Sequence, residues 1–118
     1  ILVVDNDPRI VEASIALLTR FGHRARGAAD GAGALAQCAT VDAVLADYQL
    51  DQGEDGLTLI EELRQLRPGL PAALITAEGN PAIRQRAAAL GVEVFAKPVS
   101  PTMIEAFLAR VSMTQVEP

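Results

Sequence analysis

The chain has 118 residues, half of them hydrophobic, and a net charge of -5, which fits one globular domain with its own packed core. An acidic chain lacks the basic face that duplex binding needs, so direct nucleic-acid binding is not expected. One cysteine and one histidine exclude an internal disulfide and a cysteine-based zinc site and argue against a Ser-His-Asp triad. Since no apolar run approaches the roughly 20 residues of a membrane span, we expect a cytoplasmic domain without membrane contact.

Apolar runs and helix signals alternate along the first part of the chain. The run Ile1–Asp5 predicts a strand, and Asp7 followed by Pro8 predicts the start of a helix that ends at Gly22. A weaker and more polar run over Arg24–Ala28 predicts an edge strand. Because the first apolar run begins at residue 1 without a preceding Met, we expect the chain to be a domain of a longer protein.

The remainder of the chain repeats this alternation. Continuous apolar runs over Ala43–Asp47, Ala72–Thr76 and Val92–Ala96 predict strands that are buried on both faces, as in a parallel sheet. We expect helices between and after them: Asp30–Ala39, a segment with Leu59, Leu63 and Leu66 that ends before Pro68, a segment from Pro81 to Gly91, and one that begins at Pro101. Residues 1–113 are expected to form the single domain, with Thr114–Pro118 as a frayed tail.

Five strands in alternation with five helices predict an α/β fold, a doubly wound five-stranded parallel sheet with helices on both faces. In such a sheet, ligands bind outside the carboxyl ends of the strands. Four reactive side chains stand at these predicted ends: Asp5, Asp47, Thr76 and Lys97. Each alone has a structural explanation, as a turn cap, a strand residue or a solvated lysine. Their convergence on one edge of the sheet favours a functional site.

Two carboxylates, a hydroxyl and an ammonium group suit the transfer of a phosphoryl group to a carboxylate. Asp47, central at this edge, is the candidate nucleophile. Asp5 and Asp47, with the backbone carbonyl of Gln49, offer the oxygen ligands that Mg²⁺ prefers. Thr76 can donate a hydrogen bond to a phosphoryl oxygen. Lys97 can pair with the carboxylate before the transfer and with the phosphoryl group after it.

Four segments occur in a distinctive order and spacing: Ile1-Leu2-Val3-Val4-Asp5, Asp47-Tyr48-Gln49-Leu50, Leu74-Ile75-Thr76-Ala77 and Lys97-Pro98. Through them the whole chain resembles the receiver domains of two-component response regulators. The resemblance implies a flavodoxin-like (βα)5 fold with the strand order 2-1-3-4-5. It also implies that Asp47 is the phosphoacceptor, Asp5 an acidic metal-site residue, Thr76 the switch hydroxyl and Lys97 the lysine of the site, with a cis bond to Pro98.

The metal site departs from the family pattern. Asn6 replaces the second acid of the usual acidic pair, so the expected Mg²⁺ site of Asp5, Asn6, Asp47 and the Gln49 carbonyl carries one negative charge fewer. We therefore expect Mg²⁺ to bind more weakly than is usual. In receivers, the positions of Gln49 and Glu78 influence how fast the phosphoryl group is lost.

Two further departures concern the switch and the loop after the phosphoacceptor. Val94 stands where the family often has a switch aromatic, and the neighbouring Phe95 is expected to face the other side of the sheet. The segment Leu50–Gly56 lacks the common Met-Pro and is one residue longer than usual.

The resemblance also implies partners. A histidine kinase or a His-containing phosphotransfer domain would donate the phosphoryl group and would meet the first helix. A weak dimer can form through the fourth helix, fifth strand and fifth helix, the output face near Arg84, Arg86 and Glu93. Four segments most resemble the C-terminal receiver of a hybrid sensor histidine kinase: Asp5-Asn6-Asp7-Pro8, Asp47-Tyr48, Ile75-Thr76-Ala77 and Lys97-Pro98-Val99. In that setting the parent chain is an enzyme, whereas this domain is a phosphoacceptor.

Two other functions stay open at this point. Asn6 is also compatible with a degenerate receiver that acts as an unphosphorylated protein-interaction module. A small aspartyl-phosphate phosphatase is a third hypothesis, but such enzymes usually carry a second catalytic aspartate where Gln49 stands. Metal titration separates a phosphorelay receiver from a degenerate one, and turnover of a phosphomonoester tests the phosphatase hypothesis.

Overall fold

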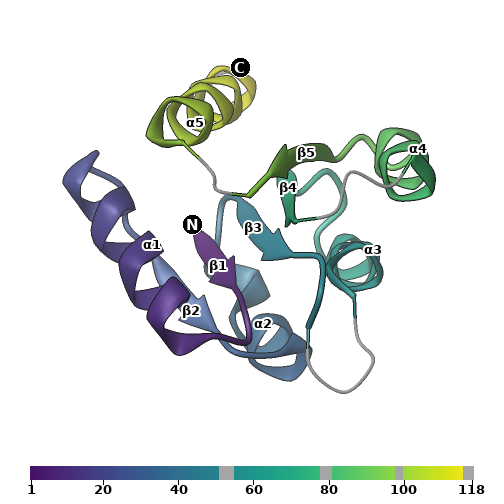
Figure 1. The fold of residues 1–118 in the computed structure, drawn as a ribbon, viewed down its shortest axis with the longest axis horizontal. Coiled ribbons are helices and arrows are strands. Elements are labelled where there is room, and N and C mark those ends of the chain that lie inside the picture. Colours follow the sequence, from purple (N-terminus) through teal and green to yellow (C-terminus); the bar gives the residue numbers. More distant parts are fainter. Residues whose placement is uncertain (51–54, 78–80, 98–99, 116–118) are drawn as a thin grey trace.

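The structure, a computed structural model, describes residues 1–50, 55–77, 81–97 and 100–115 (Figure 1). The strands are β1 (Leu2–Val4), β2 (Arg26–Ala28), β3 (Val44–Asp47), β4 (Ala72–Thr76) and β5 (Glu93–Ala96). The helices are α1 (Pro8–Arg20), α2 (Gly31–Gln37), the 3₁₀ turn η1 (Cys38–Thr40), α3 (Gly56–Leu66), α4 (Pro81–Ala89) and α5 (Pro101–Gln115). The predicted alternation of strands and helices is therefore confirmed.

The five strands form one parallel sheet in the order β2-β1-β3-β4-β5, as predicted. The register aligns the carboxyl ends of the strands, because Val4 pairs with Ala46, Asp47 with Ile75, and Thr76 with Ala96. Asp5, Asp47, Thr76 and Lys97 consequently occupy neighbouring positions along a single edge of the sheet.

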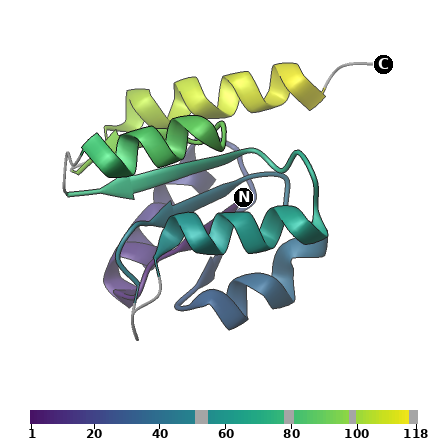
Figure 2. The same ribbon diagram turned by 90° about the vertical axis from the view of Figure 1, so that its right-hand side faces the viewer.

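Helices cover both faces of the sheet. In Figure 1 the strands form a diagonal band, with α1 and α5 to its upper left and α2, α3 and α4 to its lower right. Alternate strand residues serve the two cores: Leu2 and Val4 pack on the side of α2 to α4, whereas Val3 packs with α1 and α5. Figure 2 shows α5 and α3 on opposite sides of the strands.

The position of the expected switch aromatic follows the same alternation. Val94 packs against the core on the α2 to α4 side, and Phe95 belongs to the core beneath α1 and α5. There Phe95 meets Phe107 edge to face, with ring centroids 6.2 Å apart. The expectation that Phe95 faces away from the Val94 side is confirmed.

Helix boundaries mostly follow their sequence signals. Asp7 caps α1, its carboxylate accepting a hydrogen bond from the Arg9 N–H at 2.9 Å. Helix α5 continues to Gln115 and so includes the first two residues of the expected tail. The expectations for Glu78, for the Lys97–Pro98 bond and for residues 51–54 fall outside the described residues. None of the described helices is long and apolar enough to cross a membrane.

Candidate functional site

Three polar side chains are buried in the described part of the chain, and all three stand at predicted site positions. Asp5, Asp47 and Thr76 are only 4%, 6% and 3% exposed. Asp5 directly follows β1, whereas Asp47 and Thr76 are the last residues of β3 and β4, at the same edge of the sheet. Aspartate is rarely buried without a partner because desolvation of a charged carboxylate is costly. Two buried aspartates at the carboxyl ends of neighbouring strands therefore indicate a functional site.

Lys97 supplies a positive charge to this pair. Its Nζ lies 3.1 Å from Asp47 Oδ1, and its side chain is one-third exposed, at 33%. The backbone holds it there, since the Lys97 N–H donates to the Thr76 carbonyl at 3.0 Å. The Tyr48 N–H donates to the Ile75 carbonyl at 2.8 Å in the same way. The ladders of β3, β4 and β5 thus extend past the strand ends and fix the site residues.

Asp5 lies beside this ion pair. Burial raises the pKa of the Asp5 carboxyl, the hydrogen bond from the Asp7 N–H opposes this shift, and the charge of Asp47 raises the pKa further. That hydrogen bond is 2.9 Å long. Lys97 acts in the opposite direction to Asp47, but one ammonium group faces two carboxylates. The site is therefore short of positive charge.

The donor set fits a hard divalent cation. Two buried carboxylates and the nearby backbone carbonyls offer oxygen atoms, the ligands of Mg²⁺. The described residues contain no group of three His, Cys, Asp or Glu side chains that could hold a metal ion. A cation here would take further ligands from carbonyl, water or phosphoryl oxygens, which is the usual pattern for Mg²⁺ in phosphate sites.

Two predicted metal-site residues lie around this pair and are exposed. Asn6 follows Asp5 directly, and Gln49 follows Asp47 by two positions. The Gln49 backbone forms an isolated antiparallel bridge with Asp55. Asp7 does not stand in for the missing acid, because its carboxylate caps α1 and pairs with Arg9 at 3.2 Å. The metal roles of Asn6 and Gln49 stay predictions.

A mostly apolar cavity of about 490 Å³ adjoins the site between α1, α5 and the sheet. Asp5, Asp47 and Lys97 line one part of it, and Ile10, Leu17, Leu45, Ile75 and Ile104 are among the apolar residues of its wall. Ile10 is 40% exposed. The sequence carries no signal for this cavity, because it depends on how far apart the two helices pack.

The start of α3 was also missed by the sequence analysis. The Asp55 carboxylate accepts a hydrogen bond from the Thr58 N–H at 2.8 Å and caps the helix. Gly56 then packs so tightly on β3 that a Cβ atom there would collide with the Asp47 carbonyl oxygen and lie 2.8 Å from Leu74 Cδ1. An Asp-Gly pair before an apolar periodic segment is the N-cap signal that could have located this start.

The fold and the site together define a doubly wound α/β domain with a buried aspartate pair and a lysine at the carboxyl edge of its sheet. The model of the response regulator receiver domain matches residues 1–109. The chain belongs to the response regulator receiver domain family, as the sequence predicted. This is a family of two-component phosphorelay signalling.

Relatives with a curated description are similar over part of their length. The chain is 33% identical over 82 residues to the transcriptional regulatory protein GlrR of Escherichia coli, covering 68% of this chain and 18% of that protein. It is 32% identical over 126 aligned positions to the probable transcriptional regulatory protein TcrX of Mycobacterium tuberculosis, covering 99% of this chain and 53% of that protein. The chain thus spans about a fifth of the first relative and about half of the second.

Solved structures are similar over nearly the whole chain. The chemotaxis protein CheY4 of Vibrio cholerae matches with a TM-score of 0.83 and 26% identity, covering 93% of this chain and 95% of that chain. A receiver domain protein from Methanospirillum hungatei matches with a TM-score of 0.87 and 24% identity, covering 99% and 96%. The second likeness supports the fold alone.

Proposed function

We propose that this domain accepts a phosphoryl group from a phosphohistidine onto Asp47. The observation that carries the proposal is the buried Asp47 carboxylate, which lies 3.1 Å from Lys97 Nζ and beside the equally buried Asp5. Neither carboxylate adds to the core, whereas both suit chemistry at a strand edge.

In the proposed step, a carboxylate oxygen of Asp47 attacks the phosphorus atom. The bond between phosphorus and the imidazole nitrogen breaks, the electron pair returns to the imidazole, and an acyl phosphate forms on Asp47. Lys97 holds the carboxylate before the transfer, and its ammonium group can then pair with a phosphoryl oxygen. The buried Thr76 hydroxyl at the end of β4 would donate a hydrogen bond to another phosphoryl oxygen.

Asp5, Asp47 and the Gln49 carbonyl would hold Mg²⁺, with Asn6 contributing at most a neutral oxygen. When bound, the cation would screen the negative charge shared by the carboxylates and the phosphoryl oxygens. The raised pKa of Asp5 supports this assignment, because the metal-free site carries two carboxylates against one ammonium group. The loss of one acid at position 6 predicts weakened rather than absent binding.

The phosphodonor would be a histidine kinase or a His-containing phosphotransfer domain that approaches beside α1. The apolar cavity supports this, since it opens next to Asp47 and Lys97 and includes the exposed Ile10. A helix that presents its phosphohistidine to Asp47 would cover the exposed Ile10 beside it. The domain would belong to one of two kinds of longer protein. The sequence motifs predict a hybrid sensor kinase, and the names of the relatives favour a transcriptional regulator.

Intact-mass analysis after incubation with acetyl phosphate tests the proposed function. We expect the wild-type chain to gain the mass of one phosphoryl group in the presence of Mg²⁺ and not in EDTA. Asp47→Asn, which keeps the shape of the side chain, should gain nothing. If the folded wild-type chain gains no mass from acetyl phosphate or from any phosphorylated histidine domain, the unphosphorylated interaction module becomes the better description.

A further inference from the structure

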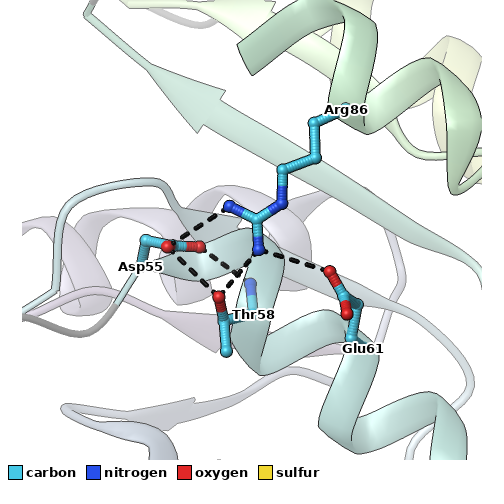
Figure 3. Close-up of polar contacts among 4 residues, drawn as sticks. All are labelled: Asp55, Thr58, Glu61 and Arg86. Atoms are coloured by element: carbon cyan, nitrogen blue, oxygen red, sulfur yellow. Dashed lines mark hydrogen bonds and ion pairs between the residues drawn. The ribbon is translucent and has the colours of Figure 1, made fainter. Parts of the chain in front are cut away.

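Arg86 of α4 reaches across to the beginning of α3 (Figure 3). Its guanidinium lies 2.8 Å from Thr58 Oγ1, 3.2 Å from Glu61 Oε1 and 3.4 Å from Asp55 Oδ2. The resemblance to receiver domains places Arg86 near the output face, whereas the structure directs its guanidinium to α3. One residue of α4, two of α3 and the N-cap of α3 thus form one polar cluster, which we call the Arg86 cluster: Asp55, Thr58, Glu61 and Arg86.

The Arg86 cluster is connected to the backbone that follows Asp47. Asp55 is both the cap of α3 and the bridge partner of Gln49. Its neighbour Gly56 donates its N–H to the Tyr48 carbonyl at 2.8 Å. Gly56 also has no space for a Cβ atom against the Asp47 carbonyl. A displacement of the α3 start would therefore move the backbone of Tyr48 and Gln49.

The buried face of helix α4 is small. It is nine residues long, and Ile83 and Ala87 are its buried side chains within the described range Pro81–Ala89. An isolated surface ion pair contributes only about 0–1 kcal/mol. A guanidinium that contacts two carboxylates and a hydroxyl, one of the carboxylates being a helix cap, is held in a more defined geometry.

We propose that Arg86 is a positioning residue for the Asp47 site, acting through Asp55 on the backbone of Gln49. This inference rests on the proposed function, because the Gln49 carbonyl matters as a ligand of Mg²⁺. Through Asp55, the contacts of the Arg86 cluster would hold the backbone of Gln49 in place and, with it, that carbonyl. Because such coupling is reciprocal, Mg²⁺ binding would also affect the position of α4 through the same contacts.

The substitution Arg86→Met removes the charge and the donors but keeps an unbranched helix-forming side chain. Arg84→Met is the matched control, because residues two apart on a helix face different directions and Arg84 is exposed on the same helix. Arg86→Lys keeps the charge without the planar group of donors and should lie between the wild type and Arg86→Met.

Two measurements apply to each variant. Amide hydrogen exchange without Mg²⁺ reports on the Gly56 N–H, which is bonded to Tyr48, and on the Thr58 N–H, which is bonded to Asp55. Mg²⁺ affinity can be followed by the emission of Tyr48 or by calorimetry, since the chain has one tyrosine and no tryptophan. We expect Arg86→Met to speed exchange of both amides and to weaken Mg²⁺ binding several-fold, with Arg84→Met close to wild type.

The outcomes separate this inference from the proposed function. If wild type binds Mg²⁺ and Arg86→Met binds it equally well, the positioning role is wrong even if exchange speeds up, and the proposed function stands. If the two arginine variants behave alike in both measurements, the positioning role is also wrong. If wild type itself shows no Mg²⁺ binding by calorimetry, the proposed metal site fails together with this role.

Discussion

Asp5 is buried although the fold gains no packing from its carboxylate. The charge is desolvated and faces Asp47, so the pKa of Asp5 is raised in the folded protein. A raised carboxyl pKa means that the folded state binds the proton more tightly than the unfolded chain does. Its contribution to stability is complete below the unfolded pKa and is lost as the pH rises through the folded pKa.

We therefore predict that Asp5→Asn stabilises the metal-free protein at neutral pH and raises the urea concentration at its unfolding midpoint. The gain over wild type should grow as the pH rises from roughly 4, where an unfolded aspartate titrates. Urea unfolding in EDTA across a pH series measures it. Asp7→Asn is a control for which the pH dependence of stability should have the opposite sign. The hydrogen bond from Arg9 lowers the pKa of the Asp7 carboxyl. If Asp5→Asn is less stable than wild type at every pH, the carboxylate is well compensated and this explanation fails.

Asn6 stands where a second acid would add charge to the proposed metal site. If its side chain lines that site, Asn6→Asp should tighten Mg²⁺ binding several-fold, because ligand charge strongly determines the affinity for hard cations. Calorimetric titration of the two proteins with Mg²⁺ gives the comparison. An unchanged affinity would mean that the side chain at position 6 points away from the metal.

At the scale of secondary structure, α3 begins in tight contact with the end of β3. Gly56 lies against the Asp47 carbonyl and Leu74, and backbone cannot yield as a flexible side chain can. The start of α3 is therefore coupled to the end of β3 through the glycine itself.

Gly56→Ala should cost about 1–3 kcal/mol of unfolding free energy, the usual range for overpacking. Gly33→Ala in α2 is the matched control, because its Cβ would lie 3.3 Å from Asp30 Oδ1 and 3.4 Å from the Ala28 side chain. We expect this control to change stability much less. Equal costs in denaturant unfolding would show that α3 can shift to accept a methyl group.

Helix starts show what sequence can and cannot predict at this scale. Asp7-Pro8 identified the start of α1 correctly because capping is a local interaction. Arg86 is different, since its partners lie 25 to 31 residues away and its sequence neighbourhood reads as an ordinary exposed helix. Which way its guanidinium turns depends on the packing of α4 against α3.

For the whole molecule, the alternation of apolar runs and helix signals was sufficient to predict a five-stranded parallel sheet, whereas the strand order came from the resemblance to receiver domains. Parallel pairing with right-handed crossovers leaves few topologies, and it places the strand-end residues Asp5, Asp47, Thr76 and Lys97 on one edge. The cavity between α1 and α5 and the tight contact at Gly56 could not be predicted, since both depend on distances between elements.

The most direct test of the account asks which residue carries the phosphoryl group. After incubation with acetyl phosphate and Mg²⁺, sodium borohydride reduces an aspartyl phosphate to homoserine, and tandem mass spectrometry locates the change. Trypsin places Asp5 and Asp47 in different peptides, because Arg9 and Arg26 lie between them. We expect homoserine at position 47 and an unmodified aspartate at position 5. Reduction at Asp5 or at any residue other than Asp47 would contradict it.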